Sequence, residues 1–336
     1  MYDRILRKAI RTPWAIEPTY AAIVQDLLGF RAAGGRLTED EIVARIEAHT
    51  GEKFAGSRQA PTPSGSIAVI PIYGVIAHRA FEASSGATST EYVGAQLRRV
   101  MAEPSIGTIL FDVSSPGGTI EGVPELAAAI AAARKTKYIV ASSNALMASA
   151  AYWIGSQAHE VVVTPSGGVG SVGVFTLTED WSEKLARDGV KINAISAGDY
   201  KLEGAWWEPL SDEARAFLQQ SVDSAYASFT GAVAKGRGTT AATVKKQYGQ
   251  GRCLEADAAL AAGMVDRIET FDQTIARLQK ASAAAGGRAG ASALRAIAAS
   301  GLTNARTAAT IAEDLADDQV AADADAIAIA RALADL

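Results

Sequence analysis

The sequence predicts an α/β fold in which buried strands alternate with helices through the middle of the chain. Short runs rich in Ile and Val, such as residues 67–72 and 108–113, are typical of buried strands. Segments with apolar residues at helical spacing, such as 89–101 and 122–135, lie between them. This alternation indicates a sheet covered by helices. Further strands are expected at 138–142 and 160–163, and a helix is expected over 149–155.

The chain before this central region is expected to be helical. Apolar residues at helical spacing and a capping sequence predict that residues 1–55 form a helical N-terminal segment. Residues 56–65 are rich in Pro, Ser and Gly and are expected to be a linker. The main domain is therefore expected to span residues 66–280.

Residues 281–336 differ in composition from the rest of the chain. Residues 281–290 are almost wholly Ala, Gly and Ser, which is typical of a flexible linker. The remainder combines many alanines with aspartates, and with Ile, Leu and Val at near-helical spacing. Two interpretations of this acidic tail stay open: a disordered segment, or an amphipathic interaction helix or remnant scaffold segment.

The composition argues against several classes of protein. A net charge of −5 and a pI near 5.4 do not favour nucleic-acid binding. The chain has no run of about eighteen apolar residues, and charges interrupt its first eight positions, so neither a membrane anchor nor a secretory signal is expected. The single cysteine, Cys253, excludes an internal disulfide and fits a reducing compartment. We therefore expect a cytosolic protein.

Neither a metal nor a nucleotide cofactor is predicted. The histidines, His49, His78 and His159, are scattered, and no cysteines or carboxylates accompany them at metal-ligand spacing. The chain lacks a Walker-type Gly-rich loop, so it carries no ATP-driven motor of its own. A triad that uses a histidine stays open, because its members need to be adjacent only in space.

Ser149 and Lys201 together form a candidate nucleophile and base. Ser149 lies among small residues, and Lys201 follows 52 residues later, after a strand-like run at 190–195. A lysine amine activates a serine only when it is neutral, and burial lowers the pKa of catalytic lysines to about 7–8. The carboxylates of Asp199 and Glu203 must therefore point away from the amine. Taken singly, the serine is an ordinary helix cap and the lysine a solvated loop residue.

A Gly-rich turn supplies a candidate oxyanion hole. An apolar strand ends in Ser115-Pro116-Gly117-Gly118, a turn whose backbone amides are free to face a developing negative charge. The backbone N–H of Ala150 lies beside the nucleophile at a helix start and is the other expected donor. From the residues alone, the donor in the turn is Gly117 or Gly118.

These motifs are accompanied by others in a recognisable order. They are the serine in its small-residue setting with Tyr152, the Ser-Pro-Gly-Gly turn, Thr164-Pro165 followed by Gly170–Val174, Gly198–Lys201, and Gly251-Arg252 followed by Ala262–Asp266. Their order resembles the signal peptide peptidase A family of Ser-Lys serine proteases over about residues 66–270. Within that family the chain is most similar to the phage head-maturation proteases, because Thr12–Ile16 and the helix predicted after it resemble their leader.

The resemblance implies a fold and a set of residue roles. The fold would be the spiral of repeated β-β-α units shared by Clp-type proteases and crotonases. Ser149 would be the nucleophile, and Lys201 the general base and then the general acid. Gly118 would be the preferred oxyanion donor of the turn, with Ala150 as its partner. Ser171 would orient the lysine amine through its hydroxyl.

The resemblance also implies a biological setting. An ATP-independent endopeptidase without cofactors is expected to cut capsid or scaffold proteins, in the bacterial host cytoplasm or inside a phage prohead. Family members form ring- or dome-shaped assemblies, so a homo-oligomer is expected, with Trp206-Trp207 as an interface anchor or a core pair. Nucleic acid and membranes are not expected partners. One departure is Ala150-Ala151, where Gly-Gly is usual, and its methyl groups would narrow the site.

Three alternatives stay open. A host-type cytosolic protease like signal peptide peptidase would share the dyad and cut other proteins. A crotonase-like enzyme would use the same oxyanion hole on acyl-CoA thioesters, with carboxylates in place of the dyad. An inactive scaffolding protein would keep the fold, although intact Ser149 and Lys201 argue against it.

Overall fold

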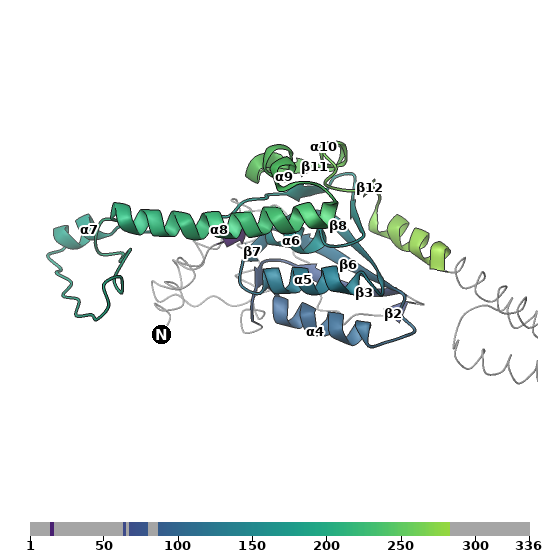
Figure 1. Ribbon diagram of the computed structural model, residues 1–336, viewed down its shortest axis with the longest axis horizontal. Helices are drawn as coiled ribbons and strands as arrows, with labels where there is room; N and C mark the ends of the chain where they lie inside the picture. The colour runs from purple at the N-terminus through teal and green to yellow at the C-terminus, as the bar shows by residue number, and fades with distance from the viewer. Residues whose placement is uncertain (1–13, 17–62, 65–66, 80–86, 283–336) are drawn as a thin grey trace, which may run out of the picture.

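The computed structural model describes residues 14–16, 63–64, 67–79 and 87–282 (Figure 1). Within these residues, a mostly parallel sheet forms the centre of the molecule and helices pack across it. The predicted α/β class is therefore confirmed. The helical segment expected at 1–55 and the acidic tail lie almost entirely outside the described residues.

The main sheet has eight strands within the described residues, in the order β11-β10-β8-β6-β3-β2, with β9 beside β8 and β12 beside β9. Its centre is three neighbouring parallel strands, β3 (Ile67–Tyr73), β6 (Thr108–Ser115) and β8 (Tyr138–Ala148). The other five are β2 (Pro63–Ser64), β9 (Glu160–Val163), β10 (Gly168–Gly170), β11 (Cys253–Glu255) and β12 (Arg267–Ile268).

Both faces of this sheet are covered, which explains why its strands are continuously apolar. On β6, the alternate residues Ile109, Phe111 and Val113 belong to the main hydrophobic core. Leu110 faces the opposite side and packs in a smaller cluster with Leu278, which lies on a helix over 271–282. The two clusters hold the strands between two apolar layers.

Helices cover the larger core. The Ser89 hydroxyl caps the helix that begins at Thr90, and it accepts a hydrogen bond from the backbone N–H of Tyr92 at 3.3 Å. The Ser211 hydroxyl caps the helix that begins at Asp212, and it accepts from the backbone N–H of Ala214 at 3.1 Å. Figure 1 shows the four helices side by side. They are α4 (Thr90–Met101), α5 (Val123–Ala133), α6 (Ala150–Gly155) and α8 (Asp212–Arg237), and the smaller α9 (Ala241–Gln247), η2 (Gly249–Gly251) and α10 (Ala256–Ala261) follow.

The C-terminal half of α8 is anchored on α6. The Trp153 ring stacks on the Phe229 ring, with centroids 4.7 Å apart and planes within 6°. The Gln157 amide donates to the Ala232 carbonyl at 3.1 Å. These contacts hold α6 and the C-terminal half of α8 together.

We expect Phe229→Ala to lower the free energy of unfolding by about 3–5 kcal/mol, because Phe229 is fully buried and its loss leaves a cavity against Trp153. Chemical denaturation monitored by circular dichroism measures this change. The matched control is Tyr92→Ala, which removes an exposed aromatic side chain from α4 and should change stability by less than about 0.5 kcal/mol. Equal effects of the two substitutions would contradict the assignment of the stack as a core contact.

A second, smaller sheet lies beside the end of β8. Its order is β1-β7-β4-β5, with β7 in the middle. β1 pairs antiparallel with β7, and β4 pairs parallel with it. The strands are β1 (Trp14–Ile16), β4 (Ile76–Ala77), β5 (Thr88–Ser89) and β7 (Gly117–Thr119).

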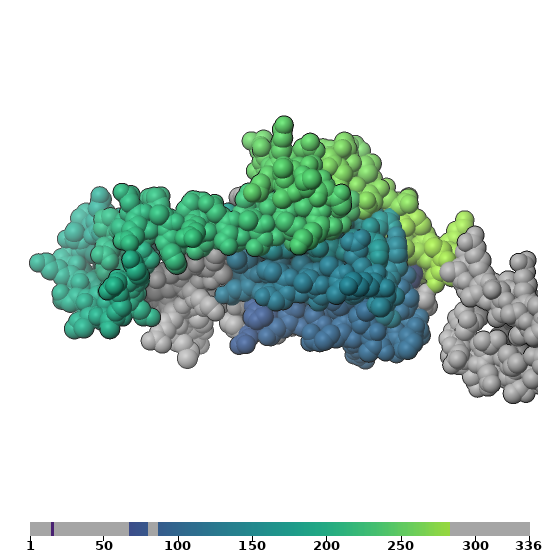
Figure 2. Space-filling model, in the orientation of Figure 1, coloured from purple at the N-terminus to yellow at the C-terminus, as the bar shows by residue number. Residues whose placement is uncertain are grey.

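An extended segment, here called the arm, leaves the body between β10 and the middle of α8. The arm comprises residues 177–217 and includes α7 (Ser182–Arg187) and the first residues of α8. Figures 1 and 2 show it projecting beyond the sheet and its covering helices. Only Ala205 and Ala214 are buried in the arm, and every residue from 186 to 201 is exposed.

The structure differs from the sequence-based expectations at three places. Residues 14–16 form a strand, although a helical segment was expected there. β8 continues to Ala148 rather than ending near residue 142, because Ser142 and Ser143 are buried between neighbouring strands. The strand-like run at 190–195 forms no strand, because it lies in the exposed arm and pairs with none of the strands in the described ranges.

Candidate active site

Ser149 lies at a sharp turn between a strand and a helix. It follows the last residue of β8 and precedes α6, and its φ of 55° and ψ of −117° are rare for a residue with a side chain. Its N–H donates to the Gly170 carbonyl at 2.7 Å, and its carbonyl accepts from the Trp153 N–H at 2.9 Å. A strained turn of this kind presents a serine at the end of a strand, as nucleophiles require.

The Ser149 hydroxyl is buried but not used by the fold. The side chain has no exposed surface, and Oγ forms no hydrogen bond within the part of the chain that the structure describes. Ser149 occupies the N-cap position of α6, yet its side chain makes no capping hydrogen bond. The ordinary interpretation of this serine as a helix cap is therefore not supported. A buried hydroxyl without a partner is costly and calls for a functional explanation.

Two glycines allow the backbone of β7 to approach Ser149 on one side and β4 on the other. Gly117 has a φ of 96°, and a Cβ atom added there would lie 2.9 Å from Ser149 Cβ. A Cβ atom at Gly118 would lie 1.8 Å from the carbonyl oxygen of Ile76, so no side chain fits. The Gly117 N–H donates to the Ser115 hydroxyl at 3.1 Å. This hydrogen bond favours Gly118 over Gly117 as an oxyanion donor.

Ser171 lies beside the nucleophile, at the end of a neighbouring strand. It follows Gly170, whose carbonyl binds the Ser149 N–H, and its own N–H donates to the Arg252 carbonyl at 2.9 Å. Ser171 is buried and has a φ of 50°. A single chain therefore brings together four of the sequence-predicted elements: the serine, the following Ala150 amide, the Gly turn and Ser171.

The motif that ends at Asp266 supports α6 and does not reach the nucleophile. The Tyr152 hydroxyl donates to the Met264 carbonyl at 2.8 Å. Arg237 donates to both carboxylate oxygens of Asp266, at 2.7 and 2.8 Å. Burial alone would raise the pKa of Asp266, but hydrogen bonds from Arg237 and the Val161 N–H lower this pKa below its ordinary value. The motif therefore has a packing role.

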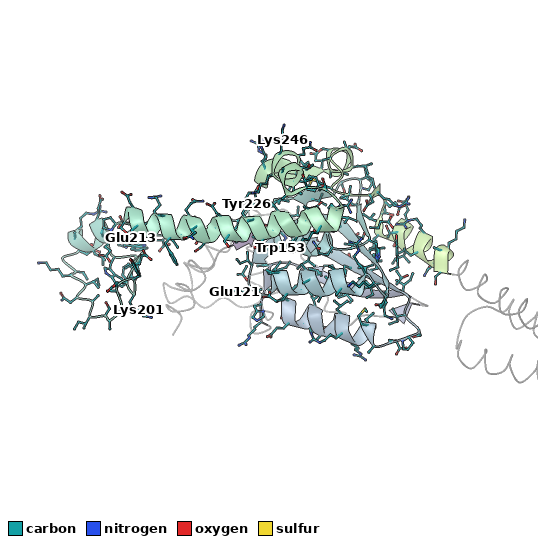
Figure 3. The ribbon with its side chains drawn as sticks, viewed as in Figure 1. Glu121, Trp153, Lys201, Glu213, Tyr226 and Lys246 are labelled. Atoms are coloured by element: carbon teal, nitrogen blue, oxygen red, sulfur yellow. The ribbon has the colours of Figure 1, made fainter. Side chains whose placement is uncertain are left out.

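Lys201 lies far from Ser149 within one chain. It is exposed in the arm, near the N-terminal end of α8, whereas Trp153 of α6 lies along the C-terminal half of that helix (Figure 3). The helix has 26 residues, which corresponds to a length of about 39 Å. The Lys201 N–H donates to the Gly198 carbonyl at 3.1 Å, so its motif forms a local turn. The structure does not bring the predicted nucleophile and base together in one subunit.

The strand β1 is a site element that the sequence analysis missed. It pairs with β7 immediately beside the Ser149 turn, and its last two residues are buried. Two prolines, Pro13 and Pro18, bracket this apolar run. Because a residue before proline avoids helical backbone angles, the prolines were the signal against a continuous helix here.

Other kinds of site find no support in the described ranges. They contain no group of three His, Cys, Asp or Glu side chains arranged to hold a metal ion. In the same ranges, no helix combines the length and apolar character needed to cross a bilayer. Cys253 is half-buried in β11. The candidate site therefore consists of a buried serine, backbone amides and the small residues around them.

Comparisons with known proteins converge on one family. The profile of Peptidase family S49 matches residues 131–285, which include Ser149, Ser171 and Lys201. The chain is 28% identical, over 79% of its length, to the head-tail preconnector protein GP5 of Enterobacteria phage P21. It is 29% identical over 66% of its length to capsid assembly protease C of Escherichia phage lambda, and 30% identical over 63% to Protease 4 of Salmonella typhi.

A solved structure of a ClpP1 variant from Listeria monocytogenes matches 60% of this chain and 91% of its own, with 15% identity and a TM-score of 0.38. The chain spans 55% and 53% of the two phage relatives and 34% of the Salmonella protein. The resemblance seen in the motifs is confirmed by the family match and by relatives with protease names. Residues 131–285 of the chain therefore match peptidase family S49, and the chain is similar to proteins with protease names.

Proposed function

We propose that the protein is an ATP-independent serine endopeptidase in which Ser149 of one subunit is activated by Lys201 of a neighbouring subunit. The observation that carries the proposal is the buried Ser149 hydroxyl, which has no partner among the described residues, while Lys201 sits on an arm that leaves the body. The match of residues 131–285 to a peptidase family supports hydrolysis of peptide bonds as the reaction. It disfavours the crotonase-like alternative.

The geometry fits a two-step acyl transfer. A neutral Lys201 amine takes the proton of Ser149 Oγ as the oxygen attacks the carbonyl carbon of the scissile bond. The N–H groups of Gly118 and Ala150 donate to the oxyanion that forms. The lysine ammonium then protonates the leaving amine, and the same lysine activates the water that hydrolyses the acyl-enzyme. The Ser171 hydroxyl orients the amine at the buried end of the site.

The arm carries the apolar surface that a contact between subunits needs. Of ten large apolar side chains exposed in the described ranges, seven lie in the arm, and Ile195 is fully exposed. A cavity of about 290 Å³ is lined by residues of α7, by residues 189–192 and by Trp207. Apolar surface gathered in this way marks an interaction site. The seven residues are Leu177, Trp181, Val190, Ile192, Ile195, Tyr200 and Phe217.

The tryptophan pair organises the arm. Trp206 packs edge-on against Trp181, with ring centroids 6.4 Å apart, and against Trp207 at 5.6 Å. The Trp181 N–H donates to the Trp206 carbonyl at 2.8 Å. Both Trp206 and Trp207 are half-buried. The pair forms a small core within the arm, and its exposed surface is the part that we propose contacts a neighbouring subunit.

We propose capsid or scaffold proteins as the substrates. Two of the relatives are phage proteins, one named a head-tail preconnector protein and the other a capsid assembly protease. A host-type housekeeping protease is the alternative, favoured by the match to Protease 4. Incubating the purified protein with a phage capsid protein and its scaffold protein, and separately with unfolded casein, distinguishes the two proposals. Defined fragments of the phage proteins alone support the first.

We expect the double variant Ile195→Asp/Phe217→Asp to dissociate into smaller species and to lose at least about 90% of peptidase activity, because charges on the arm oppose burial in a neighbour. Light scattering gives the mass, and a fluorogenic peptide gives the activity. The control, Tyr92→Asp, places a charge on an exposed side chain of the body and should leave mass and activity unchanged. Peptidase activity in a monomer of the double variant or of the control would contradict the proposal that the site is shared between subunits.

A further inference from the structure

β1 lies where a peptide substrate has to lie, if the protein is the peptidase proposed above. Ala15 pairs with Gly118, and Ile16 pairs with Gly117. The position of a Cβ atom on Gly117 would be 2.3 Å from the Ala15 carbonyl oxygen and 2.9 Å from Ser149 Cβ. The Ala15 carbonyl oxygen and Ser149 Cβ both lie within 3 Å of this Cβ position, so the Ala15 carbonyl lies beside the nucleophile.

β7 has a single edge to offer a substrate. Its other edge pairs with β4 through Gly118 and Ile76. Extended peptides bind by adding a strand to a sheet edge, and a scissile carbonyl must reach both the nucleophile and the oxyanion amides. The edge beside Ser149 is held by β1. A substrate strand and β1 therefore compete for the same backbone groups.

The side chains of β1 show what this edge accepts. Ala15 and Ile16 are 0% and 2% exposed, so both side chains are buried. Ala15 packs in the main core together with Ala150 and Ala151, the small pair that follows Ser149. An enclosed site of this kind accepts a small residue next to the nucleophile and excludes charged ones.

We propose that Trp14–Ile16 is an intramolecular pseudosubstrate of the Ser149 site. The strand must leave β7 before a peptide binds, and the peptides that replace it carry a small residue in the place of Ala15 and an apolar residue in the place of Ile16. The chain between residues 16 and 63 is long enough for β1 to leave without pulling on the main sheet.

A reversible lock tests whether β1 has to move. Trp14 and Thr119 are opposite each other in the antiparallel register, at a separation that a disulfide spans. In a Cys253→Ala background, oxidised Trp14→Cys/Thr119→Cys is expected to cleave a fluorogenic peptide at least tenfold more slowly than the reduced form. The control pair, Thr108→Cys/Tyr138→Cys, joins partners in the main sheet and should be indifferent to oxidation. Full activity of the locked protein would overturn the proposal.

A binding measurement tests the same idea without any chemistry. In the Ser149→Ala full chain, a labelled peptide with the sequence of residues 10–20 competes with the chain's own β1. Weakening β1 by Ile16→Ser is expected to tighten peptide binding at least tenfold in fluorescence anisotropy, whereas the same peptide with Ala15→Asp should not bind. Unchanged affinity, together with an unchanged melting temperature, would overturn the proposal. Tightened binding without Ser149-dependent cleavage would instead contradict only the proposed peptidase function.

Discussion

An equimolar mixture of Ser149→Ala and Lys201→Ala proteins should regain about a quarter of wild-type peptidase activity, because each functional site needs one subunit of each kind in the right order. Each variant alone should be at least about 10³-fold less active than wild type, since a nucleophile and its base act as a unit. The structural reason is that Lys201 lies in the arm, far from Trp153 of α6, the helix that Ser149 begins within the same chain (Figure 3). Activity is measured with a fluorogenic peptide after subunit exchange.

Two controls make this experiment decisive. Lys201→Arg alone should be inactive, because a guanidinium does not act as a base. Mixed with Ser149→Ala, it should restore the same activity as Lys201→Ala does, because both variants contribute only their Ser149. Wild type mixed equally with the Ser149→Ala/Lys201→Ala double variant should fall to about a quarter of its undiluted activity, against about half for a site within one subunit. No recovery, with exchange shown by mass-tagged subunits, would place both residues in one chain.

Gly118→Ala should strongly reduce peptidase activity and lower the melting temperature. The added methyl group would lie 1.8 Å from the Ile76 carbonyl oxygen, so the backbone of β7 has to move away from β4. That movement displaces the amide proposed to bind the oxyanion, and loss of one such donor costs about 3–4 kcal/mol of transition-state stabilisation. We expect kcat to fall by about 10²–10³-fold in the protein that remains folded.

The matched control is Gly231→Ala in α8. No atom lies within 4 Å of a Cβ atom at Gly231, and alanine favours a helix interior by up to about 1 kcal/mol. This variant should therefore melt at the same or a higher temperature and keep its activity. If Gly118→Ala retained wild-type kcat, the Gly118 amide would have no part in catalysis.

The central sheet was predictable from sequence because local pattern and burial agree there. The runs at 67–72 and 108–113 are rich in β-branched residues, and both become parallel strands covered on two faces. The helices expected at 89–101 and 122–135 appear as α4 and α5. Each of these elements has its partners nearby in sequence, so the pattern of one element was enough to place it.

Part of the candidate site was predictable for a different reason. Ser149 and the Gly turn could be named because their chemistry requires particular residue types, and the structure does bring them together. The position of Lys201 was not accessible, because spacing along a chain does not show whether a long helix carries a segment away from the body. The run at 190–195 was misread as a strand because its apolar residues alternate, although no strand in the described part of the chain pairs with it.

The exposed arm has a consequence for how the enzyme would behave in a dilute solution. If each site is completed by a neighbour's arm, an isolated subunit has no site, and an open row of subunits always has one site fewer than its subunits. Specific activity would then rise steeply with protein concentration and level off once rings close. A newly made subunit would be harmless until its local concentration is high, so crowding of copies at one place would itself switch proteolysis on.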